Sequence, residues 1–142
     1  MPYAPSTALP ALGREHPYAI ALRDGYTAFA KGDLDYIREI LAEDVVHSVT
    51  GRSRISGDHR GQDEVLDFYV RVFELSGGTF HSEPYSFLAD DHHGVVLVHA
   101  MAERAGRTLD DRGVDVHRFV DGRITEIRSV AGDQHAVDAF WS

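Results

Sequence analysis

The spacing of apolar residues predicts a helical hairpin followed by a strand in the first third of the chain. Between residues 18 and 29 four apolar side chains recur at intervals of four, four and three, as on one face of a helix. Gly32 ends this helix, and Asp33 can cap a second helix with buried positions between residues 34 and 41. The segment EDVVHSV at residues 43–49 then changes to strand character.

A third helix and a run of strands are predicted for the rest of the chain. After the turn formers of residues 50–61, an apolar helix face runs from Val65 to Phe73, and Ser76–Gly78 ends it. The Asp121–Gly122 pair predicts a hairpin because both central residues of such a turn need positive φ. Strand-like runs occupy residues 79–89, 94–106, 113–120 and 123–130. This order predicts an α+β fold, with a curved antiparallel sheet wrapped around three helices.

Length and composition fit one domain. The chain has 142 residues, of which 43% are hydrophobic, enough for one packed core. Residues 1–15 hold three of the five prolines and show no sustained period, so we expect a flexible N-terminal tail there. The folded domain is expected over residues 16–142.

Charge and cysteine content exclude several function classes. The formal net charge of −9 leaves no basic face for nucleic acid, and no apolar run is long enough to span a membrane. We therefore expect a soluble, cytoplasmic protein. Without cysteine there is no disulfide, thiolate nucleophile or cysteine-ligated zinc. The histidines His47, His99 and His117 lack the close spacing of a metal site, so we expect no metal and no cofactor.

The order of several short phrases resembles a known family. GDLD, LAEDVV, GRSRISGDHRG, DGRITEI and DQHAVDAFW together resemble SnoaL-like members of the nuclear-transport-factor-two-like superfamily, from about Tyr18 to Trp141. The resemblance implies a cone-shaped fold with an apolar pocket between the sheet and the helices. Relatives include isomerases, polyketide cyclases, dehydratases, epoxide hydrolases and proteins without known catalysis, so the fold alone does not choose among functions.

Comparison with ketosteroid isomerase within this superfamily points to Asp115. The resemblance places Asp115 where that enzyme has the acid that hydrogen-bonds the substrate oxyanion. The general-base aspartate of that enzyme corresponds to a position near Ser48 or Val49 of this chain, and its helix-one tyrosine corresponds to a position near Gly25. Two of the three expected groups are therefore absent. Ketosteroid isomerisation by the usual residues is therefore not expected.

Alternation along GVDVHRFV brings Asp115 and His117 to one face of a strand. If that face lines the pocket, a carboxyl group in apolar surroundings could donate a proton or a hydrogen bond to the substrate. The opposite face holds Val114, Val116 and Val120, and alternation alone favours these valines as the core. Both orientations remain open at this stage.

His47 is the third candidate for a catalytic group. It lies between valines in the first strand, and a buried neutral imidazole could act as a general base. A hydrogen-bonded core histidine is the alternative. The residues expected to contact the substrate are Tyr26, Phe68, Val49, Phe119 and Ile127.

Two functions follow as hypotheses. The first is a cofactor-independent acid–base enzyme for a small apolar substrate, such as a polyketide or terpenoid intermediate undergoing cyclisation, isomerisation, dehydration or epoxide opening. The second is a non-catalytic module that binds a hydrophobic ligand or serves in assembly. An outer apolar face of Val114, Val116 and Val120 beside Ile124 also predicts a homodimer.

Overall fold

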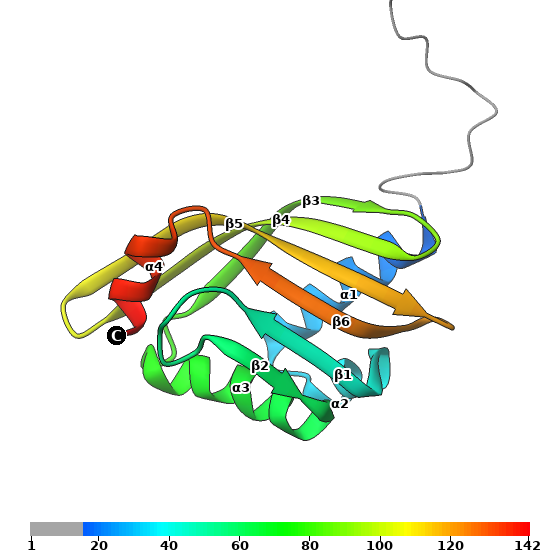
Figure 1. Cartoon of the computed structure of the whole chain (residues 1–142), viewed down its shortest axis with the longest axis horizontal. Coiled ribbons are helices and arrows are strands. Elements are labelled where there is room, and N and C mark those ends of the chain that lie inside the picture. The colour runs from blue at the N-terminus through cyan, green and yellow to red at the C-terminus, as the bar shows by residue number, and fades with distance from the viewer. Residues whose placement is uncertain (1–15) are drawn as a thin grey trace, which may run out of the picture.

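A computed structural model describes residues 16–142, and the predicted tail at residues 1–15 lies outside this range. These residues form four helices and one six-stranded sheet, whose arrangement can be followed in Figure 1. None of the helices within residues 16–142 is long and apolar enough to cross a membrane. In chain order the elements are α1 (Pro17–Lys31), α2 (Leu34–Ile40), β1 (Leu41–Val49), β2 (Gly57–Arg60), α3 (Gly61–Leu75), β3 (His81–Ala89), β4 (His93–Arg104), β5 (Arg107–Val120), β6 (Arg123–Val130) and α4 (Gln134–Trp141).

The helix boundaries follow from local capping. Gly32 has a φ of 71°, and its backbone N–H closes α1 on the carbonyl groups of the last turn. The Asp33 side chain then accepts a hydrogen bond from the backbone N–H of Tyr36 at 3.1 Å and starts α2. These two caps confirm the helical hairpin expected from the sequence.

The sheet is a meander extended by a parallel pair. Its strand order is β2-β1-β6-β5-β4-β3, and β3 to β6 form the predicted antiparallel meander. In the β5–β6 turn Asp121 and Gly122 have φ values of 51° and 82°, as a two-residue hairpin requires. The sheet is mixed, however, because β1 pairs with β6 in parallel and with β2 antiparallel. The short strand β2 and the helix α4 were not among the predicted elements.

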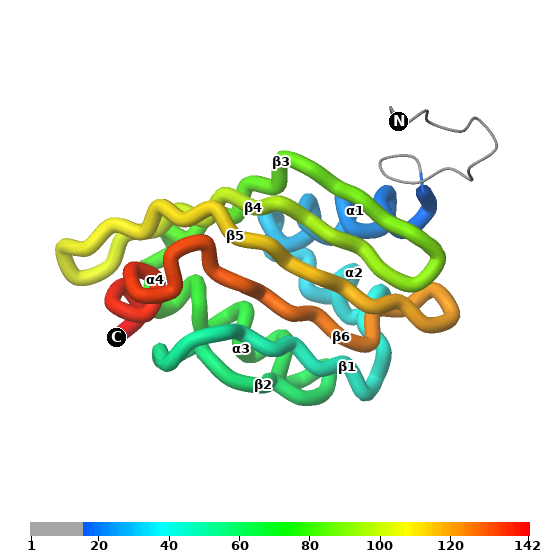
Figure 2. Tube along the Cα trace, turned by 45° about the horizontal axis from the view of Figure 1, so that its top comes forward, coloured from blue at the N-terminus to red at the C-terminus, as the bar shows by residue number. Residues whose placement is uncertain are grey.

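The arrangement gives the cone-shaped α+β fold. Figures 1 and 2 show α1, α2 and α3 along one face of the curved sheet, and α4 beside the β4–β5 hairpin. Two separate groups of buried apolar side chains lie between the layers. The first group, which includes Leu22, Val45 and Val96, joins α1 and α2 to the sheet. The second group, which includes Phe68, Leu109 and Trp141, joins α3 and α4 to the sheet.

The β4–β5 hairpin holds α4 in place. Its turn lies at Ala105–Gly106, where both residues have positive φ, and the two flanking arginines bind the end of α4. Arg104 Nη1 donates to the Ser142 carbonyl at 2.8 Å, and Arg107 Nη1 donates to the Ala139 carbonyl at 2.7 Å. The cations therefore satisfy carbonyl groups at the end of α4 that have no partner within the helix.

The orientation of β5 is decided by burial. His117 and Phe119 are buried, whereas Val120 is exposed and Val116 is half-buried, so Val116 and Val120 lie on the outer face. The expectation that Ile124 shares this outer face is wrong. Ile124 pairs with Phe119 across the hairpin, and cross-strand partners share a face, so Ile124 points into the core.

Candidate functional site

An apolar cavity of about 220 Å³ lies between the sheet and the helices. Its acidic lining residues are Asp111 and Asp115, and no Lys or Arg lines it within the part of the chain that the structure describes. The Asp111 carboxylate accepts hydrogen bonds from the backbone N–H groups of Gly132 and Asp133 and so holds the start of α4. The Asp115 carboxylate is instead bound by side-chain hydroxyl groups. The aromatic lining consists of Tyr26, Phe29, Phe68, Tyr69, Phe80 and Trp141.

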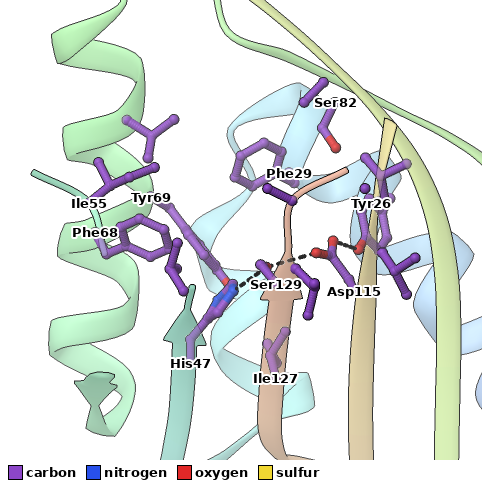
Figure 3. A pocket seen from close by; sticks show the side chains of 18 of the residues that line it. Tyr26, Phe29, His47, Ile55, Phe68, Tyr69, Ser82, Asp115, Ile127 and Ser129 are labelled. Atoms are coloured by element: carbon purple, nitrogen blue, oxygen red, sulfur yellow. Dashed lines mark hydrogen bonds between the residues drawn. The ribbon is translucent and has the colours of Figure 1, made fainter. Parts of the chain in front are cut away.

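Both carboxylate oxygens of Asp115 accept hydrogen bonds from hydroxyl groups (Figure 3). Tyr26 on α1 donates to Oδ2, and Ser129 on β6 donates to Oδ1 at 2.7 Å. Asp115 and Ser129 are cross-strand partners, which explains their contact. A carboxyl group that accepts two such bonds is arranged as an ionised acceptor rather than as a donor.

His47 on β1 continues this chain of hydrogen bonds. Its Nε2 lies 2.8 Å from Ser129 Oγ, and its Nδ1 lies 2.9 Å from the Tyr69 hydroxyl on α3. Burial, together with the smaller effects of the nearby His117 and His59, lowers the pKa of His47 to about 3, so the imidazole is neutral at pH 7. His47 therefore carries one ring proton.

The position of that proton follows from counting donors. The hydroxyl of Ser129 has one proton, which it gives to Asp115, so it must accept from His47 Nε2–H. Nδ1 is then unprotonated and accepts from the Tyr69 hydroxyl. Every bond of the chain from Tyr69 to Asp115 thus points toward the carboxylate.

The two tyrosines keep their protons. Burial, followed by the charge and hydrogen bond of Asp115, raises the pKa of Tyr26 well above its usual value. Burial and the Asp115 charge also raise the pKa of Tyr69. Both hydroxyl groups are therefore donors in the resting site.

His117 lies two residues after Asp115 on the same strand face. Burial lowers its pKa, so this imidazole is also neutral near pH 7. Its Nδ1 lies 3.3 Å from the Gly94 carbonyl oxygen, which can only accept, so Nδ1 bears the proton. Nε2 is therefore unprotonated, and His117 is a second basic residue among those that line the cavity.

Comparison with known proteins identifies the family. The SnoaL-like domain family matches residues 22–127. The chain belongs to this family. It is 30% identical to the uncharacterized Mycobacterium tuberculosis protein Rv0034, over 85% of this chain and 93% of that protein.

Two solved structures share the fold of this SnoaL-like domain. Bal32a, from a soil-derived mobile gene cassette, is similar with a TM-score of 0.84 and 34% identity, covering 87% of this chain and 95% of Bal32a. A nuclear-transport-factor-two-like protein from Burkholderia xenovorans has a TM-score of 0.75 and 21% identity, covering 87% and 94% of the two chains. The fold class expected from the sequence is thereby confirmed.

The SnoaL-like cavity brings together most of the residues singled out in the sequence. Asp115, His117 and His47 all line it, as do the four contact residues Tyr26, Phe68, Val49 and Ile127.

Phe119 is the exception among the expected contact residues. It stacks on Tyr18 of α1 with ring centroids 3.9 Å apart and is not among the lining residues. The reason is distance along the strand, because four residues beyond Asp115 correspond to roughly 13 Å. His99, from the three-histidine set, also lies outside the lining, and its Nε2 bonds Asp110 at 2.5 Å.

Three members of the hydrogen-bond network were overlooked or misjudged in the sequence. The helix-one tyrosine that the isomerase comparison placed at Gly25 is supplied one position later by Tyr26, which reaches Asp115. Ser129 could have been found from strand alternation, because it lies two residues after Ile127 and so shares its face. Tyr69 had only a helix-face signal, next to Phe68.

Proposed function

We propose that this SnoaL-like protein is a cofactor-independent acid–base enzyme that transfers a proton on a small, largely apolar substrate. The observation that carries the proposal is the Asp115 carboxylate, held by two hydroxyl donors at the wall of an apolar cavity. A base in such surroundings is oriented and partly desolvated before the substrate arrives.

The proton transfer can be written with the atoms of the site. Asp115 Oδ2 takes a proton from a carbon next to a substrate carbonyl group, and the electron pair of the C–H bond moves into an enolate. The new Oδ2–H bond then donates to the Tyr26 oxygen. The Tyr26 hydroxyl keeps its proton and donates its hydrogen bond to the enolate oxygen instead of to Asp115. This hydrogen bond stabilises the negative charge that develops on that oxygen.

The histidines take different roles in this proposal. His47 has both ring nitrogens in hydrogen bonds and a pKa of about 3, so it positions Ser129 rather than acting as the direct base. His117, whose Nε2 is unprotonated, is the second candidate base. Isomerisation, cyclisation, dehydration and epoxide opening of a polyketide- or terpenoid-like compound each include at least one proton transfer to or from an acid–base group.

The experiment is hydrogen–deuterium exchange into one- and two-ring ketones, with 2-tetralone as the central probe, followed by NMR. We expect wild type to accelerate exchange and Asp115→Ala to lose on the order of 10²-fold or more, roughly 3 kcal/mol. If Asp115 is the base, Asp115→Asn falls as far as the alanine variant. If Asp115 instead donates to an oxyanion, the asparagine variant keeps part of the activity.

Two controls separate catalysis from ligand binding. Ser82→Ala removes another hydroxyl group from the lining and should leave exchange unchanged. A wild-type protein that binds the ketones by calorimetry but does not accelerate exchange would contradict the enzyme and support the non-catalytic binding module.

A further inference from the structure

The chain of hydrogen bonds ends at a second group that faces the cavity. Tyr69 and Asp115 both line it, and the chain joins them through two intermediates, His47 and Ser129. Before any proton moves, each O–H or N–H group of this chain donates its hydrogen bond in the direction from Tyr69 toward Asp115. This arrangement allows protons to move in one direction only, toward the carboxylate.

We propose that Tyr69 is a second catalytic position, at which the Asp115 carboxylate removes a proton from an O–H group through this relay. The O–H group belongs to the substrate or to a water molecule in the cavity. We propose an O–H rather than a C–H group because protons pass readily between oxygen and nitrogen atoms that are already hydrogen-bonded. The assignment of a catalytic role rests on the proposed function, whereas the relay itself rests on the hydrogen bonds alone.

The transfer balances bond by bond. The O–H bond in the cavity breaks and its proton forms a new O–H bond at Tyr69, while the former Tyr69 proton moves to Nδ1 of His47. The Nε2 proton of His47 moves to Ser129, and the former Ser129 proton moves to Oδ1 of Asp115. The electron pair stays on the cavity oxygen, so one negative charge has moved from Asp115 to that oxygen and His47 has changed tautomer.

A neutral imidazole suits this role. An imidazolium ion at His47 would trap the proton halfway, but burial opposes that charge. The other titratable groups that face His47 are His117 on β5 and His59 on β2, and those that face Asp115 are Tyr26 and Tyr69 together with His117. None of them lies between the members of the chain, which are in direct hydrogen-bond contact.

The relay makes the His47 tautomer a readout of the Asp115 charge. With Asp115 ionised, His47 carries its proton on Nε2; with Asp115 protonated on Oδ1, it carries the proton on Nδ1. Nitrogen-15 NMR of histidine-labelled protein distinguishes the two tautomers, and carbon-13 NMR of the Asp115 carboxyl group gives its charge. Neither measurement requires turnover, so failure of the relay and failure of the proposed function are distinguishable.

The expected result is Nε2–H in the wild type at pH 7, and Nδ1–H wherever the carbon-13 signal shows that Asp115 carries a proton. Ser129→Ala should abolish the coupling, and the matched variant Ser82→Ala should retain it. Asp115→Leu removes the carboxylate and tests the same coupling without a change of pH. In that variant Ser129 has lost its carboxylate acceptor, so we expect its hydroxyl to donate to His47 Nε2 and His47 to be found as Nδ1–H at pH 7.

Three results would overturn the relay. The first is Asp115 titrating while the His47 tautomer stays constant, and the second is the same coupling in Ser129→Ala. The third is Nε2–H persisting in Asp115→Leu. For the catalytic role, the rate losses of Tyr69→Phe and Ser129→Ala should be strongly non-additive in a double-mutant cycle, since both cut one pathway. Additive losses would show that Tyr69 acts independently of the chain.

Discussion

Removal of the buried imidazole of His47 should make the protein less sensitive to acid. The folded protein holds this group neutral, with a pKa of about 3, whereas in the unfolded chain it has the ordinary value near 6.5. Between these two values the unfolded state binds one more proton than the folded state. Stability therefore falls as pH falls from about 6.5 toward 3, and it is unaffected by this group above that window.

The size of the effect follows from the two pKa values. Between pH 7.5 and pH 4.5, protonation of the unfolded imidazole should cost about 2.7 kcal/mol of unfolding free energy. This is a large share of the 5–15 kcal/mol that is typical of a whole domain. His47→Gln keeps a polar side chain but cannot take up the proton, so the variant should lose this part of the pH dependence even if it is less stable at pH 7.5.

The assay is urea denaturation followed by circular dichroism at several pH values between 7.5 and 4.5. The matched control is His135→Gln on α4, whose side chain is exposed, and it should keep the wild-type slope. Parallel pH profiles of wild type and His47→Gln would refute the reasoning, because they would mean that His47 takes up its proton equally in both states.

Three further predictions concern assembly and packing. We propose a homodimer through the outer sheet face, so sedimentation equilibrium should give about twice the chain mass of 15.8 kDa, and Val120→Lys should shift it toward monomer. A monomeric wild type at micromolar concentration would contradict this. Gly94→Ala places a Cβ 2.3 Å from Leu22 Cδ1, so it should lower the unfolding free energy by about 1–3 kcal/mol, and an unchanged melting temperature would argue against this close contact. Arg107→Ala should speed amide hydrogen exchange in α4, whereas Arg123→Ala should not; equal exchange in both would mean that the hairpin does not hold the helix.

Local signals in the sequence were sufficient for most of the elements. Gly32 and Asp33 act within one helical turn, and Asp121–Gly122 acts within one hairpin, so their structural consequences do not depend on the rest of the chain. The parallel pairing of β1 with β6 joins segments about 80 residues apart, such as His47 and Ile127. No local pattern specifies that pairing.

The sequence pointed to single residues of the candidate site but not to the contacts between them. Asp115 came from the comparison with ketosteroid isomerase, and His117 and His47 came from their positions in predicted strands. Ser129 was not found, because a serine in a strand carries no distinctive pattern. Its importance comes from lying opposite Asp115 and beside His47, which only the strand order brings together.

The cavity lies between the two groups of buried apolar side chains described above, and both groups contribute to its lining. Tyr69 packs against both groups, and Phe68, Val72 and Trp141 of the second group also form part of the cavity wall. A ligand that fits would add contacts to both sides at once and so complete the interior as one unit. Binding at one hundred times the dissociation constant adds about 2.7 kcal/mol to the unfolding free energy. A rise in melting temperature across a library of small ketones, phenols and terpenoids would therefore rank compounds that fit the cavity before any reaction has been assigned.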